Sequence, residues 1–315
     1  FTGSHNSTIR FRSALALATA QGFEPHLVVV DHAPGGLFRE FVPAIDWLLQ
    51  RTPRPRFVLL MRDITFGPEQ TRSIWQGERV ISLLDEVYDD ILIYGDQRVF
   101  DPVTAYNLSD VAAAKSRFCG YLAPLPPRRT PEQVRHELQT GETPLVVVSA
   151  GGGHDGGPVL RAYIEGLRHR DTSPVSSYIV TGPLLSEAER RDIERLADGL
   201  PSTRIVEVDP DFAAAIRAAD AVVSMGGYNS VAEAVYFGKR PIIVPRLPGP
   251  EEQVLRAEGF RRLGLASVVM PSTLSAETLW HAVEASLATA LPASNPPEFD
   301  GLNQIAQELS TLQGG

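Results

Sequence analysis

Two glycine-rich turns in the second half of the chain most constrain its fold. The first, at residues 150–157, follows the apolar run 145–148, and the second, at residues 225–230, follows the run 221–223. An apolar, β-branched run followed by glycines and a helix start is typical of a parallel α/β sheet, where backbone N–H groups can bind an anion. Two such turns can close on one nucleotide.

The same alternation of short β-branched runs and longer amphipathic stretches continues along the chain and predicts the α/β fold class. Two helix starts support it: Thr130 precedes Pro131 and Gln133, and Ser186 precedes Glu189, in capping-box spacing. The predicted strands lie at residues 26–30, 57–61, 91–94, 145–149, 177–181, 204–208, 221–224, 241–245 and 267–269.

Length and proline content predict two domains. The chain has 315 residues, of which 43% are hydrophobic, enough for more than one core. The proline-rich stretch 124–131 has the composition of a stiff hinge. We therefore expect an N-terminal lobe at 1–124, a C-terminal lobe at 125–297, and a last helix at 298–315 that packs on either lobe.

Charge and composition exclude several classes of function. Lys and Arg number 29 against 38 Asp and Glu, a net charge of -9, which argues against a nucleic-acid partner. Cys119 is the single cysteine, so no intrachain disulfide and no multi-cysteine zinc site is expected. With no spaced His/Asp cluster and no run near 18 apolar residues, we expect no metal, no cofactor and a cytoplasmic location.

In the first turn, Gly151, Gly152 and Gly153 allow the backbone to approach a phosphate, and a helix starting near Pro158 would point its positive end there. His154 is placed to donate to a phosphate oxygen, or else lies in solvent. A plain strand-to-helix connection is the alternative for this turn, because it lacks the Lys-Ser/Thr of a Walker loop.

In the second turn, Gly226 and Gly227 lead into a helix for which Asn229 or Ser230 is the expected cap. Glu233 follows one turn inside, where a carboxylate can accept two hydrogen bonds from a ribose diol while the turn faces phosphate. Taken alone, a glutamate in this position is more often a surface acid that complements a helix dipole.

The next strand and loop add two polar candidates. Arg246 follows the strand at 241–245, and its guanidinium suits a diphosphate or a donor sugar, with a solvated arginine as the alternative. Gln253 comes one loop later. The order of turn, helix, strand and loop places Gly226, Glu233 and Gln253 on one rim, at the carboxyl ends of consecutive strands.

At this point the chain resembles a known family. Residues 225–257 look like the nucleotide-sugar signature of GT-B glycosyltransferases of the MurG and monogalactosyldiacylglycerol synthase group, and residues 30–34, 60–64 and 94–96 are similar to a predicted bacterial subgroup of it. The resemblance implies two Rossmann-like lobes with parallel sheets facing a central cleft. It implies an inverting, metal-independent glycosyltransferase that needs no cofactor beyond its donor.

The same resemblance implies the partners. A nucleoside diphosphate sugar, by analogy a UDP-sugar, would bind the C-terminal lobe, and a small-molecule or lipid-linked acceptor the N-terminal lobe. A lipid-linked acceptor would bring a peripheral contact with the inner face of the membrane.

The resemblance also implies roles for single residues. Gly151, Gly152 and Gly153 match the glycine-rich loop that faces the cleft, and Gly226, Gly227 and Ser230 match the phosphate-facing turn. Glu233 matches the ribose-binding glutamate and Gln253 the glutamine that contacts the donor sugar. The stretch 208–212 lies where the base-contacting loop runs.

One departure concerns the catalytic base. Relatives open with a strand and a glycine-rich loop that carries a histidine, and nothing before Ile9 supplies that strand, so the N-terminal lobe is expected to be incomplete. The remaining candidates for the base are Asp31, His32 and Asp63, near predicted strand ends. The first two are equally turn or cap residues, and Asp63 is equally an ion-pair partner of Arg62.

Two other functions remain open from the sequence. A UDP-N-acetylhexosamine 2-epimerase-like enzyme shares the two-lobed architecture, although the arginine-rich motif of that family is missing from the second lobe. A nucleotide-sugar-binding protein without turnover would also account for the two turns.

Overall fold

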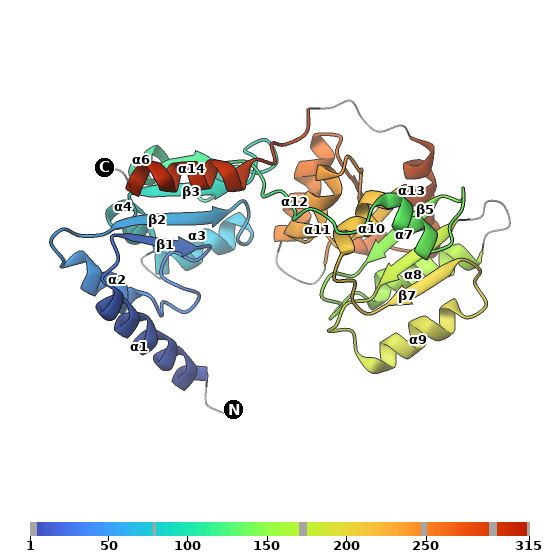
Figure 1. Ribbon diagram of the computed structural model, residues 1–315, viewed down its shortest axis with the longest axis horizontal. Coiled ribbons are helices and arrows are strands. Elements are labelled where there is room, and N and C mark those ends of the chain that lie inside the picture. Colours follow the sequence, from blue (N-terminus) through green and yellow to red (C-terminus); the bar gives the residue numbers. More distant parts are fainter. Residues whose placement is uncertain (1–4, 78–79, 170–174, 247–250, 290–294, 314–315) are drawn as a thin grey trace. The chain divides into compact units, whose positions relative to one another are not determined.

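The computed structural model describes residues 5–77, 80–169, 175–246, 251–289 and 295–313, and it divides into two compact units (Figure 1). The first unit combines Phe1–Leu122 with Pro297–Gly315, and the second is Ala123–Pro296. The predicted boundary after residue 124 lies two residues beyond the observed one. The first four residues, at the opening of the predicted incomplete lobe, are outside the described residues.

The first unit contains a parallel sheet in the order β1-β2-β3-β4, formed by β1 (Leu27–Asp31), β2 (Arg56–Arg62), β3 (Asp90–Tyr94) and β4 (Ser116–Phe118). The sequence did not predict β4, because Ser116 and Arg117 interrupt its apolar pattern. Its helices are α1 (His5–Phe23), α2 (Val42–Leu49), α3 (Pro68–Gly77), α4 (Val80–Glu86), α5 (Pro102–Ala105), α6 (Asp110–Ala114) and α14 (Gly301–Gln313).

The last helix, α14, belongs to the first unit. Its N-terminal end is held by an antiparallel bridge between Leu122 and Asp300, and Glu308 on the helix lies 3.3 Å from the guanidinium of Arg117 on β4. The prediction left the choice of lobe open, since the apolar side of an amphipathic helix does not identify its partner.

The second unit contains a six-stranded parallel sheet in the order β10-β9-β8-β5-β6-β7. Its strands are β5 (Leu145–Ser149), β6 (Ser176–Val180), β7 (Thr203–Val206), β8 (Ala221–Ser224), β9 (Ile242–Ile243) and β10 (Ser267–Val268). Its helices are α7 (Pro131–Glu137), α8 (Gly157–Arg168), α9 (Glu187–Ala197), α10 (Phe212–Ala218), α11 (Tyr228–Tyr236), α12 (Glu252–Arg262) and α13 (Ala276–Ala288), with a 3-10 turn η1 (Pro271–Thr273).

Helices cover both faces of this second sheet. Leu160 of α8 and Leu279 of α13 pack on one face with Val146 and Val148, while Ile216 of α10 joins the cluster on the other. Because both faces are buried, β5 consists almost entirely of apolar residues, as parallel strands do. This explains why the sequence predicted β5 and β8 to the residue.

The helix starts confirm two predictions and correct a third. Thr130 forms both bonds of a capping box with Gln133, and the Ser186 hydroxyl accepts from the Glu189 N–H. The expected cap at Asn229 or Ser230 is wrong, because α11 begins at Tyr228 with Gly227 as its N-cap. Gly227 is in extended conformation, φ −61° and ψ 148°, so the helix starts directly at the turn.

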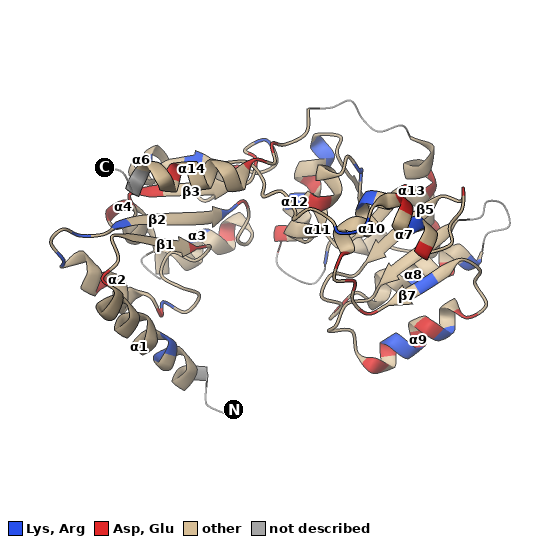
Figure 2. Cartoon of the chain, viewed as in Figure 1, with Lys and Arg blue, Asp and Glu red and all other residues tan. Residues whose placement is uncertain are grey.

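Charged residues are mixed rather than segregated on the outer helices. On α9, Glu187 pairs with Arg191 and Asp192 with Arg195, and Figure 2 shows both colours along this helix. Within the described part of the chain, no helix combines the length and the apolar character needed to cross a bilayer.

Candidate functional site

The connections of β5 and β8 diverge at the carboxyl edge of the second sheet. These neighbouring strands pair Ser149 with Ser224. From β5 the chain continues through α8 to β6 on one side, and from β8 it continues through α11 to β9 on the other. Such a point in a parallel sheet leaves a crevice between the two loops, where ligands bind. Both predicted glycine turns begin there.

The first turn is shaped by glycines at two positions and exposes a third. Gly151 and Gly153 have φ of +61° and +93°, and a Cβ on Gly153 would lie 2.4 Å from the Thr181 carbonyl oxygen. Gly152 between them is exposed, and within the described residues its N–H has no protein acceptor. The loop therefore presents a backbone donor at the carboxyl edge of the sheet.

The second turn rests on α12. Gly226 has φ of +83°, and a Cβ there would lie 2.9 Å from Ile243 Cγ2 and 3.4 Å from Gln253 Cβ. Its carbonyl accepts from Nη1 of Arg256, 3.1 Å away, and the same nitrogen lies 2.9 Å from Glu252 Oε1. The next N–H, on Gly227, has no protein acceptor among the described residues. A second backbone donor is thus fixed in place.

An ion pair connects the first turn to the loop after β9. Nε of Arg246 lies 2.5 Å from Oδ2 of Asp155, and the Arg246 N–H donates to Oε1 of Gln253 over 2.9 Å. Arg246 was predicted to meet a diphosphate or a donor sugar, with a solvated arginine as the alternative, and this stays a prediction. In the structure its guanidinium contacts a carboxylate of the protein, and its contacts connect the two loops with the start of α12.

Glu233 stands apart from these contacts. It lies on α11, half-buried, and its carboxylate has no hydrogen-bond or ion-pair partner among the described residues. Burial raises its pKa above the ordinary value of 4.5. A desolvated carboxylate without a protein donor is suited to accept hydrogen bonds from hydroxyl groups of a ligand.

The other predicted donor residues lie at the edge of this arrangement. His154 and Asn229 are exposed, and Ser230 is half-buried in the first turn of α11. Their roles stay predictions.

The loop after β7, predicted to contact a base, is fixed to the start of the second unit. Arg129 Nη2 donates to both carboxylate oxygens of Asp209, at 2.8 and 2.7 Å, and the backbone N–H groups of Arg128 and Arg129 donate to Asp211. Val208 remains 54% exposed. The predicted contact with a base stays a prediction.

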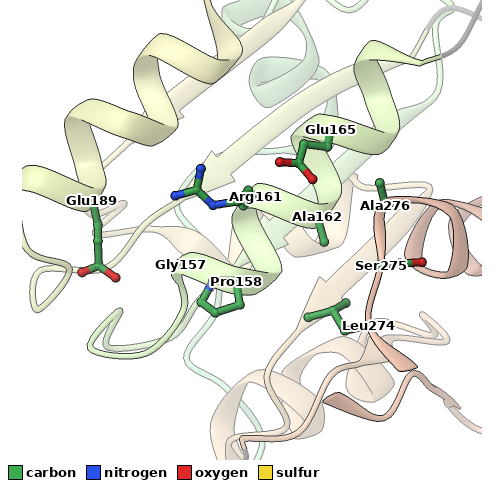
Figure 3. A pocket seen from close by; sticks show the side chains of 9 residues that line it. All are labelled: Gly157, Pro158, Arg161, Ala162, Glu165, Glu189, Leu274, Ser275 and Ala276. Carbon is green, nitrogen blue, oxygen red and sulfur yellow. The ribbon is translucent and has the colours of Figure 1, made fainter. Parts of the chain in front are cut away.

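A hollow of about 360 Å³ between α8, α9 and the start of α13 does not contain the predicted donor residues (Figure 3). Glu165 and Glu189 line it together with Arg161, and an oxygen of Glu189 lies 3.0 Å from where a Cβ on Gly157 would be. A carboxylate beside the first residue of α8 disfavours a phosphate there. The predicted use of this helix start stays a prediction, and the carboxyl edge of the sheet at β5 and β8 remains the candidate site.

In the first unit, Asp63 is not placed to act as a base. It is fully buried, its Oδ1 accepts from the Ile64 N–H at 2.7 Å, and its Oδ2 accepts from the Tyr121 hydroxyl at 2.9 Å. Both carboxylate oxygens are therefore used in hydrogen bonds inside the protein. Its role is to hold the loop after β2.

Asp31 and His32 lie at the carboxyl end of β1, and their role as candidate bases stays a prediction. Asp31 is exposed and accepts from the Tyr94 hydroxyl at 3.0 Å, and His32 is half-buried with φ of +65°. Burial, with a contribution from the Asp31 charge, raises the pKa of Tyr94 to about 12. Tyr94 therefore stays protonated and donates to Asp31.

Sequence reasoning missed three residues of these sites: Arg256, Asp155 and Tyr94. For Arg256 a signal existed, since Glu252 lies four residues earlier in the spacing of a helical ion pair. The partners of Asp155 and Tyr94 are distant in sequence, so no local pattern identifies them.

Comparison with known proteins assigns the family. Residues 152–309, half of the chain, match the glycosyltransferase family 28 C-terminal domain. The chain belongs to glycosyltransferase family 28. The matched region contains the second glycine turn, Glu233, Arg246 and Gln253.

Two curated relatives of this family 28 chain are similar over part of its length. An uncharacterized glycosyltransferase of Methanopyrus kandleri is 28% identical over 184 residues, 58% of this chain. The UDP-N-acetylglucosamine–N-acetylmuramyl-(pentapeptide) pyrophosphoryl-undecaprenol N-acetylglucosamine transferase of Rubrobacter xylanophilus is 31% identical over 144 residues, 45% of this chain. The similar regions span 49% and 40% of those two proteins.

Solved structures confirm the GT-B fold. The calicheamicin glycosyltransferase CalG4 has a TM-score of 0.64 at 17% identity, covering 100% of this chain and 82% of its own. MurG of Acinetobacter baumannii has a TM-score of 0.61 at 14% identity, and the match covers 98% of this chain and 78% of the MurG chain. A putative UDP-N-acetylglucosamine 2-epimerase of Listeria monocytogenes reaches 0.68 at 14% identity, covering 98% and 80%. At such identities the likeness concerns the fold alone.

Proposed function

We propose that this chain carries out glycosyl transfer from a nucleoside diphosphate sugar, with a UDP-sugar as donor, to the hydroxyl group of an acceptor. The observation that carries the proposal is the arrangement at the switch point of the second sheet. There, the backbone N–H groups of Gly152 and Gly227 have no acceptor among the described residues, and Glu233 lies on the helix that follows the second turn.

In this proposal each group has a distinct role toward the donor. The N–H groups of Gly152 and Gly227, with the positive end of α11, bind the diphosphate. Glu233 accepts hydrogen bonds from the ribose diol, and the Gln253 NH₂ group donates to the sugar, since its Oε1 is already used by Arg246. Loop geometry is maintained by the Arg246–Asp155 pair.

The proposed reaction is a direct displacement at the anomeric carbon. The acceptor oxygen forms a bond to that carbon while the bond to the diphosphate breaks, and UDP leaves with the electron pair, stabilised by the two turns. The acceptor proton passes to a base, for which Asp31 and His32 are the candidates. Inversion at the sugar and independence of metal are part of the proposal, as is a cytoplasmic location at or near the membrane.

The donor site is tested by calorimetric titration of UDP into Glu233→Gln. Loss of a charged hydrogen-bond acceptor should weaken binding by about 1–3 kcal/mol, roughly 5- to 150-fold in Kd. Glu187→Gln is the matched control, because this α9 carboxylate is 89% exposed. Equal UDP affinity in both variants and in the parent chain would refute the role of Glu233.

The type of reaction is tested with UDP-N-acetylglucosamine, the donor suggested by the name of the Rubrobacter relative. Release of UDP that depends on an added acceptor supports transfer. Conversion of the sugar without an acceptor supports an epimerase instead, and tight binding without either reaction supports a binding protein.

A further inference from the structure

A small cavity of about 80 Å³ lies in the first unit, beside the candidate base His32. Its walls come from the loop after β1, the loop after β2, and helices α3 and α4. The lining is largely apolar, and Ala33, Pro34, Leu37, Phe66, Trp75 and Leu83 contribute to it. It therefore lies at the carboxyl end of the first sheet, the edge at which parallel α/β sheets bind ligands.

The wall after β1 is held from several sides. The Tyr88 hydroxyl donates to the Pro34 carbonyl, and the Phe41 N–H donates to the Gly35 carbonyl at 3.0 Å. Glu40, 2% exposed, accepts from the Phe38 N–H at 2.7 Å and pairs with Arg12 of α1 at 2.7 Å. A loop fixed in this way keeps the cavity open without a ligand, which lowers the cost of binding.

The size of the cavity limits what can enter. A cavity of about 150 Å³ lined by apolar side chains is known to hold a benzene molecule. At 80 Å³ this cavity accommodates three to four carbons, or the edge of a ring, and a long alkyl chain does not fit inside. Trp75 and Phe66 provide aromatic surface against such a group.

We propose that this cavity binds a compact apolar substituent of the acceptor, a short branched alkyl group or a ring edge attached close to the reacting hydroxyl. His32 lines the cavity, so a group bound in it has its attachment point near this candidate base. The inference rests on the proposed function for the identity of its ligand as an acceptor. It favours a small-molecule acceptor over one anchored by a lipid chain.

The test is saturation-transfer NMR on the full chain with 3-methylbutan-1-ol and with 1-octanol, without nucleotide. Binding of the branched alcohol is expected to be lost in Ala33→Phe, which fills the cavity. Because each buried methylene contributes about fourfold in affinity, excluding three carbons should weaken binding by more than tenfold. Val111→Phe is the matched control, since Val111 lies on α6 at 51% exposure and does not line the cavity.

A second variant changes the cavity in the opposite direction. Leu83→Ala enlarges it and should improve binding of cyclohexanol relative to 3-methylbutan-1-ol. The inference is overturned if Ala33→Phe binds the branched alcohol as the parent does, or if 1-octanol shows the same dependence on Ala33 and Leu83. Amide hydrogen exchange in β2 and β3 detects misfolding of the first unit in these variants. Titration of UDP into the same samples separates the two proposals, because the alcohol site and the proposed UDP site lie in different units.

Discussion

At the scale of single residues, Glu233 combines two properties that oppose each other. Burial disfavours its charged form and raises its pKa, yet the proposed ribose contact requires a carboxylate. A pKa raised in the folded chain contributes stability that is present at low pH and lost as the pH rises through it. The free protein therefore bears a cost in stability at neutral pH that the proposed donor would offset.

This conflict predicts how UDP affinity depends on pH. As the pH falls from 7.5 through the raised pKa of Glu233, its carboxylate takes up a proton and UDP should bind more weakly, by up to about tenfold per pH unit below that pKa. Calorimetry on the parent chain and on Glu233→Gln isolates this contribution from the titration of UDP itself. Parallel pH profiles for the two proteins would contradict the prediction.

Glu233 also illustrates how much of the candidate site could be predicted from the sequence. Glu233 and Gln253 were predicted as candidates from their positions after strands, because strand ends in a parallel sheet meet at one edge. The buried hydrogen bond of Asp63 was not predictable, since its partner Tyr121 is 58 positions away in the sequence. A sequence shows which residue types lie near an edge, but burial decides which of them reach solvent.

At the scale of elements, the second turn depends on Gly226. Its φ of +83° and its close approach to Ile243 leave no room for a side chain. Gly226→Ala should shift the turn, move the Gly227 N–H and weaken UDP binding. Gly199→Ala is a matched control, because Gly199 also has positive φ, +76°, but has nothing within 4 Å of a Cβ.

The measurement for this pair is UDP affinity together with the free energy of unfolding. Both variants bear the cost of positive φ, about 1 kcal/mol, so the control accounts for backbone strain. A loss of UDP affinity of the same size in both would show that the turn acts only through stability.

Element prediction succeeded where local pattern and environment agree. The runs at β5 and β8 are apolar because both faces of the sheet are covered, and their bounds were predicted correctly. The start of α11 was misplaced, because the helix uses Gly227 in extended conformation instead of a polar cap. The three-residue strand β4 is defined by pairing with β3, information that lies outside its own residues.

At the scale of the whole molecule, the two proposed ligands should stabilise different units. UDP at 100 times its Kd should stabilise the second unit by about 2.7 kcal/mol, because it binds only the native state. Hydrogen exchange followed by mass spectrometry assigns the effect: peptides from β5 and β8 should gain protection, and peptides from β2 and β3 should not. Equal protection in both units, or protection confined to the first, would contradict the assignment of the donor to the second unit.

The path of the backbone has a practical consequence for dissecting the protein. The second unit is one continuous segment, whereas the first is assembled from both ends of the chain. The Tyr121 N–H donates to the Glu298 carbonyl at 2.8 Å, so the two ends of the discontinuous unit lie next to each other. In genetic terms the second unit is an insert, and excising residues 123–296 leaves two ends that a short peptide could join.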